Sequence, residues 1–134
     1  MKLLDHVSIT VRDMPRAALF YKAVLGALGV AVVYERVDAI GFGERNGPSD
    51  DSHTYLSVFA SPQAAPDTRR HWCLLAASVA QVHAFHAAGL SSGGTDGGAP
   101  GLRDYHAGYY AAFLVDPEGN RLEAVFHGAP AARP

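Results

Sequence analysis

The sequence holds a single cysteine, Cys73, among its 134 residues. One thiol cannot build an internal disulfide framework, and this composition is typical of a reducing compartment. No apolar stretch is long enough to span a bilayer, and the segment Met1 to His6 lacks the apolar core of a secretory signal. We therefore expect a cytoplasmic protein.

Charge of either sign is also scarce. Charged residues make up 18% of the chain, the net charge is −2, and the lysines and arginines form no basic stripe. Nucleic acid and anionic membranes are therefore not expected partners. Hydrophobic residues make up 49%, which favours folding over disorder. The length suits one domain, and we expect residues 1–134 to form it.

The chain repeats itself once. The run from Asp5 to Val11 resembles the run from Arg70 to Ala76, because each is a strand-like segment with a histidine near its start. Each run then meets a residue that favours the start of a helix, Asp13 in the first half and Ser78 in the second. Apolar residues at helical spacing follow both, which predicts one amphipathic helix in each half.

The repeat returns at the end of each half. The segment from Thr54 to Phe59 resembles the segment from Arg121 to Phe126, with an offset of 67 residues where the first strands differ by 65. Two more strands are expected between the helix and the last strand of each half. They are predicted at Val30 to Arg36, Ala39 to Glu44, Gly101 to His106 and Tyr109 to Val115.

Each half therefore predicts the element order β-α-β-β-β, in modules of about 1–62 and 67–128, and the fold class is α+β. Asp116 to Asn120 predicts a turn, because Pro, Gly, Asp and Asn each favour turn geometry. Gly89 to Gly101 predicts a flexible loop, which is either a connector or a lid. No Lys-Ser or Lys-Thr follows it, so it is not a phosphate-binding loop.

Alternation of side chains along the strands predicts that three metal-donor side chains project from the sheet faces that are turned away from the helices. In each strand the apolar residues should face the helices, and His6, His71 and Glu123 then project the other way. Two imidazoles and a carboxylate suit one divalent metal, namely Fe, Mn, Zn, Ni or Co, and leave positions for water or substrate. The alternative is two strand histidines bonded to solvent and a solvent-facing carboxylate.

Three segments resemble the vicinal-oxygen-chelate superfamily, which includes glyoxalase I, extradiol dioxygenases, fosfomycin-resistance transferases and bleomycin-resistance proteins. They are Asp5 to Ile9, Phe20 to Gly26 and Asp116 to Glu123, and the resemblance extends over residues 3–127. It implies that the two modules form an open, curved mixed-sheet barrel around the metal.

The resemblance also implies which positions bind the metal. They match His6, Leu56, His71 and Glu123, of which Leu56 cannot be a ligand. This departs from glyoxalase I, and the remaining set resembles that of the extradiol dioxygenases and fosfomycin transferases. Family chemistry then implies a substrate that chelates the metal through two neighbouring oxygens.

An acid or base is needed near such a metal, and the segment before the closing hairpin offers candidates. His106 is the first choice because imidazole titrates near neutral pH, and Tyr109 is the second candidate. Tyr109 and Tyr110 are adjacent in a strand, so only one of them faces the cavity. The resemblance thus implies a lyase, an isomerase or a ring-cleaving dioxygenase.

The sequence is compatible with two alternative functions. The first is a metal-free protein that sequesters a small molecule, as in bleomycin resistance. The second is thiol transfer to an epoxide, which ranks lower because no cation site for a phosphonate is evident. The resemblance implies a homodimer, and modules exchanged between chains would let His6 share a metal with His71 and Glu123 of the partner subunit. An intrachain site is equally compatible with the sequence.

Overall fold

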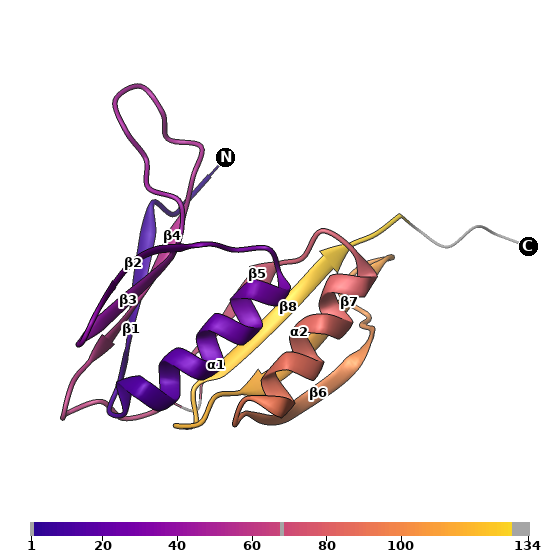
Figure 1. Ribbon diagram of the computed structural model, residues 1–134. Coiled ribbons are helices and arrows are strands. Elements are labelled where there is room, and N and C mark those ends of the chain that lie inside the picture. The colour runs from indigo at the N-terminus through magenta and orange to yellow at the C-terminus, as the bar shows by residue number, and fades with distance from the viewer. Residues whose placement is uncertain (1, 68, 130–134) are drawn as a thin grey trace, which may run out of the picture.

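The chain forms two successive β-α-β-β-β units, as the repeat predicts (Figure 1). This computed structural model describes residues 2–67 and 69–129. The first half contains β1 (His6–Val11), α1 (Met14–Ala27), β2 (Val32–Arg36), β3 (Ala39–Gly43) and β4 (Tyr55–Ala60). The second contains β5 (His71–Leu75), α2 (Val79–Ser91), β6 (Thr95–Leu102), β7 (Tyr109–Val115) and β8 (Arg121–His127). The predicted α+β class is confirmed.

Each half makes one four-stranded mixed sheet. The strand orders are β1-β4-β3-β2 and β5-β8-β7-β6, with the first and last strands of each half parallel and the other neighbours antiparallel. The two sheets stay open and separate, so β1 and β5 are edge strands, and no other strand of the described residues pairs with their outer side. In the part of the chain that the structure describes, neither helix is long and apolar enough to cross a membrane.

The helices begin where the sequence predicts them. The Asp13 carboxylate accepts a hydrogen bond from the backbone N–H of Arg16, and the Ser78 hydroxyl accepts one from Gln81, each at 3.1 Å. These bonds satisfy backbone donors that have no partner inside the helix. The helices lie side by side in Figure 1, and one apolar core joins residues of both halves, including Phe20 and Phe85.

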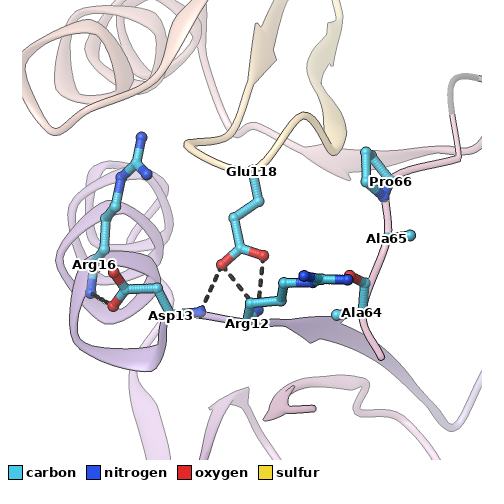
Figure 2. A pocket seen from close by; sticks show the side chains of 7 residues that line it. All are labelled: Arg12, Asp13, Arg16, Ala64, Ala65, Pro66 and Glu118. Carbon is cyan, nitrogen blue, oxygen red and sulfur yellow. Dashed lines mark hydrogen bonds between the residues drawn. The ribbon is translucent and has the colours of Figure 1, made fainter. Parts of the chain in front are cut away.

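Polar contacts of the β7–β8 turn tie the second half to the first. Figure 2 shows the Glu118 carboxylate accepting hydrogen bonds from the backbone N–H groups of Arg12 and Asp13, at 2.7 to 2.9 Å. Deeper inside, the hydroxyl of Tyr21 on α1 donates to Asp116 at 2.5 Å. Both contacts hold the closing turn against the start and the inner face of α1.

The glycine-rich segment is not the flexible loop that the sequence predicts. Residues 95–102 form β6, and the strand expected from Gly101 to His106 is replaced by a turn at its end. Pairing with β7 gives this backbone its hydrogen bonds, which outweighs the low strand propensity of glycine. A Cβ built on Gly98 would lie 3.0 Å from the Phe113 ring, so the missing side chain makes room for an aromatic one.

The strand registers correct the match between the two halves by one residue. Ser8 of β1 lies opposite Ser57, and Cys73 of β5 lies opposite Glu123. The counterpart of Glu123 is therefore Ser57, with an offset of 66 residues and not 67. Leu56 falls on the opposite face, where it is part of the apolar core. The position implied for a fourth ligand thus holds a serine hydroxyl.

The buried bond between Tyr21 and Asp116 should contribute measurably to stability. Asp116 is 4% exposed, its carboxylate also accepts from Glu118 and Asn120, and burial followed by its charge raises the pKa of Tyr21 well above the usual value. Tyr21→Phe removes the donor and should lower the free energy of unfolding by about 1.5–3 kcal/mol, as measured in urea.

Tyr105→Phe is the matched control, because Tyr105 is 71% exposed and loses the same single oxygen. It should change the free energy of unfolding by less than about 0.5 kcal/mol. Equal effects of the two substitutions would show that the buried hydrogen bond does not stabilise the fold.

Candidate metal site and its surroundings

His71 and Glu123 come together on the second sheet. The Nε2 atom of His71 lies 3.3 Å from Oε1 of Glu123, and their side chains are 49% and 4% exposed. The parallel pairing of β5 with β8 causes this proximity, because it sets Cys73 opposite Glu123. His71 lies two residues before Cys73 in β5 and therefore on the same face of the sheet. The half-exposed imidazole of His71 therefore contacts the carboxylate of Glu123, which is otherwise covered by protein.

Tyr109 holds the other oxygen of the same carboxylate. Its hydroxyl donates to Oε2 of Glu123 at 2.5 Å, and desolvation together with this bond raises the pKa of Tyr109. Tyr110 points the other way and contacts Nε2 of His83 on α2 at 2.7 Å. Of the two adjacent tyrosines, Tyr109 is thus the one on the face of Glu123.

Cys73 lies on this face and is a poor nucleophile. Burial, and secondly the charge of Glu123, raise the pKa of the Cys73 thiol to about 12. The thiol therefore keeps its proton at neutral pH, and a protonated thiol is a poor nucleophile. Beside Cys73, the same face presents His71, Glu123 and Tyr109, which contact one another.

His106 stands beside Tyr109 and is paired with a second histidine. Its Nε2 lies 2.9 Å from Nδ1 of His127, the two rings stack, and the edge of Tyr109 contacts both. Its Nδ1 lies 2.8 Å from the carbonyl oxygen of Ala107. A carbonyl only accepts, so Nδ1 of His106 carries a proton. The sequence analysis missed His127, although β7–β8 pairing sets it opposite Tyr109.

His6 lies on the other sheet. Its Nδ1 contacts Oδ2 of Asp5 at 2.6 Å, its ring stacks on Tyr55 with centroids 4.8 Å apart, and its side chain is 54% exposed. The hydrogen bond from His6, followed by that from Asn46, lowers the pKa of Asp5. Within residues 2–67 and 69–129, no three His, Cys, Asp or Glu side chains form a group able to hold a metal.

A cavity of about 630 Å³ lies between the two edge strands. Val7 of β1 and Trp72 of β5 both line it, together with Leu3 and Leu4 near the start of the chain. The edges of the two sheets therefore do not meet within one chain. This gap explains why the shared strand pattern of His6 and His71 does not bring their side chains together.

The face around His6 contains groups that the sequence analysis did not single out. The hydroxyl of Tyr34 donates to Ser57 at 2.7 Å, and Ser57 is 4% exposed. The Tyr34 ring lies across Gly41 on the next strand, where an added Cβ would be 2.2 Å from Cε1 of the ring. Arg45 then lies over the rings of Tyr34 and Tyr55. The glycine in a strand was the available signal for this packing.

The donors of the second sheet fit a metal in part. Two ligands bound at about 2.0–2.1 Å with a tetrahedral angle lie about 3.4 Å apart, close to the 3.3 Å between His71 and Glu123. The bond from Tyr109 orients the carboxylate, as outer hydrogen bonds do at metal sites. These residues can supply two ligands, and a third must come from outside this pair.

Known proteins share this architecture. The model of a family described as Glyoxalase/Bleomycin resistance protein/Dioxygenase superfamily matches residues 3–124. A glyoxalase/bleomycin resistance protein from Albidiferax ferrireducens T118 is 29% identical, covers 93% of this chain and 98% of its own, and has a TM-score of 0.77. No functionally curated protein is similar enough to be matched to the chain.

Two more distant structures share the fold. A glyoxalase/bleomycin resistance protein/dioxygenase family enzyme from Burkholderia phytofirmans PsJN is 18% identical, with 92% and 98% of the two chains covered and a TM-score of 0.65. A bleomycin resistance determinant encoded on the transposon Tn5 is 22% identical, with 96% and 100% covered and a TM-score of 0.60. Enzymes and a resistance protein therefore share this scaffold.

Gly41 should be required for the packing of Tyr34 beside Ser57. Gly41→Ala adds a methyl group where the ring lies, and the forced shift should cost about 1–3 kcal/mol of unfolding free energy in urea denaturation. In a Tyr34→Ala background the same substitution should cost much less, because the ring is absent.

Gly47→Ala serves as the control, since nothing lies within 4 Å of a Cβ at that position. If Gly41→Ala costs the same with and without the Tyr34 ring, the steric account of this pair is wrong.

Proposed function

Because the chain belongs to the Glyoxalase/Bleomycin resistance protein/Dioxygenase superfamily, we propose that it is a metal-dependent enzyme acting on a small substrate that chelates the metal through vicinal oxygens. The reaction class is that of a lyase, an isomerase or a ring-cleaving dioxygenase. The observation that carries the proposal is the His71–Glu123 pair at 3.3 Å, with Tyr109 on the second carboxylate oxygen. The single cysteine keeps the cytoplasm as the proposed location.

His6 of a partner subunit is the proposed third ligand, in a homodimer. Asp5 holds Nδ1 of His6, so that Nε2 is left free to bind a metal, the arrangement that a carboxylate commonly imposes on a ligand histidine. The imidazole is half-exposed, and both β1 and β5 have a free edge. A second copy of the chain could therefore bring His6 to His71 and Glu123 without rearranging either sheet.

The bound metal, one of Fe, Mn, Zn, Ni or Co, would supply a Lewis acid for the charge that develops on the substrate oxygens. Glu123 and His71 would hold it, and Tyr109 would fix the carboxylate. The hydroxyl of Tyr109 keeps its proton, because desolvation and Glu123 raise its pKa. Tyr109 is therefore a hydrogen-bond donor to Glu123 and is not a base, and its oxygen remains able to accept a hydrogen bond from substrate.

His106 and His127 are proposed to act as a pair beside this donor. With Nδ1 of His106 donating to Ala107, its Nε2 accepts a hydrogen bond from the protonated Nδ1 of His127 when both rings are neutral. Nε2 of His127 then carries the lone pair that can take a proton from substrate. His106 keeps the role of a candidate catalyst, now acting through the ring stacked on it.

The alternative function is metal-free sequestration of a small molecule. Two observations favour it, namely the similarity to the Tn5 bleomycin resistance determinant and the lack of a three-donor group among the described residues of one chain. The open face and the 630 Å³ cavity between the edges would then be the binding surface.

Metal content separates the two functions. Anaerobically handled protein, reconstituted with each ion and assayed by elemental analysis, should hold about one metal per subunit. His71→Ala and Glu123→Gln should each lose it. His83→Ala, which removes an imidazole bonded to Tyr110 on the helix side, should retain it. If the wild-type protein takes up none of the ions, the metal-dependent function is wrong and metal-free sequestration replaces it.

Subunit mixing tests the shared site. His6→Ala and His71→Ala homodimers should each lack metal. A heterodimer of the two variants has one site with both defects and one with neither, so it should bind one metal if the ligands come from two chains. An intrachain site would leave both sites of the heterodimer defective, and no metal would return. Differently tagged subunits, refolded together and purified through both tags, give the heterodimer for elemental analysis.

A further inference from the structure

Arg45 is an exposed residue on the face of His6, and its guanidinium lies over two aromatic rings. Its Cζ atom lies 5.1 Å from the centre of the Tyr34 ring and 5.8 Å from that of Tyr55. Two aromatic faces attract the cation and restrict its movement. Among the described residues, no carboxylate or carbonyl is within bonding distance of its N–H groups. The donors of a positioned arginine are thus available to a ligand.

Carboxylates near Arg45 in the chain already have partners. Glu44 contacts Nδ1 of His53 at 3.0 Å, and Asp5 is bonded to His6 and to Asn46. Arg36 lies over the same Tyr34 ring, but its Nε is 3.6 Å from Asp38. Of the two arginines on this ring, Arg45 is the one that forms no ion pair with an acid in the part of the chain that the structure describes.

The rings that hold Arg45 are themselves fixed. Tyr34 is anchored through its hydroxyl to buried Ser57 and lies flat across Gly41. Tyr55 stacks on the imidazole of His6 with an interplanar angle of 12°. The Tyr55 ring therefore contacts both the guanidinium of Arg45 and the imidazole of His6. An anion bound at Arg45 lies on the side of the sheet where His6 faces.

We propose that Arg45 is a specificity-determining residue that binds a carboxylate of the substrate, so that the substrate class is an anionic small molecule. This inference rests on the proposed function, because it assigns the second anchoring point of the same substrate. A planar guanidinium matches a carboxylate with two parallel hydrogen bonds, which gives orientation as well as affinity. The vicinal oxygens at the other end would then reach the metal in one fixed pose.

Metal-free protein tests Arg45 independently of any metal. Benzoate and benzamide are nearly identical in shape, and ligand-observed NMR titrations at one fixed ionic strength give both dissociation constants. Wild-type protein should prefer benzoate about tenfold, the effect of one charge-assisted hydrogen-bonding pair. Arg45→Gln should abolish the preference and leave benzamide binding unchanged.

Arg36→Gln is the matched control, since Arg36 contacts the same ring and has its own acid. It should keep the benzoate preference. Arg45→Lys should keep only part of it, because a lysine retains the charge and loses the planar fork. Equal affinity for the two probes in wild-type protein, or a preference that survives Arg45→Gln, would overturn the assignment.

Cobalt-loaded protein extends the test to the chelating substrate class. Catechol and 3,4-dihydroxybenzoate differ by one carboxylate, and the visible cobalt spectrum reports ligand binding. The spectrum should change at roughly tenfold lower concentration of 3,4-dihydroxybenzoate, and Arg45→Gln should remove this advantage. Failure of cobalt to bind would contradict the proposed metal site, while the metal-free titrations would still decide the role of Arg45.

Discussion

One buried carboxylate fixes the geometry on which the second half depends. Asp116 closes the β7–β8 turn by accepting hydrogen bonds from Glu118 and Asn120, and it receives the hydroxyl of Tyr21 from the first half. Because a shift of one residue in a hairpin moves every side chain to the other face, this turn decides where Glu123 points. The same carboxylate thus sets a strand register and joins the two halves.

The two halves use one fold for different chemistry. Where the second half has the Glu123 carboxylate, the first has the Ser57 hydroxyl, which is engaged with Tyr34. The strand that supplies the aromatic side chain over a glycine also differs between the two halves. In the first half a tyrosine of β2 lies across Gly41 of β3, whereas in the second half Phe113 of β7 lies across Gly98 of β6. Each glycine makes room for a ring that covers the sheet.

Sequence reasoning recovered what depends on local spacing. The caps at Asp13 and Ser78, the element order, and the shared face of His71 and Glu123 follow from periodicities that a strand or helix imposes on its own residues. It failed where distant segments decide. The one-residue error at Leu56 could be corrected only from the parallel pairing of β1 with β4. Likewise, β6 could be recognised as a strand only from its pairing with β7.

The place of His6 shows a further limit of strand patterns. Alternation states which face a side chain occupies on its own sheet, but it contains no information on how two sheets are set against each other. Here the helices pack together, both sheet edges stay free, and the donors of the candidate site are divided between the sheets. A metal bound by both sets of donors in a dimer would stabilise the dimer over the monomer by mass action. Assembly and metal binding would then be two aspects of one equilibrium, because the chain alone presents only part of the ligand set.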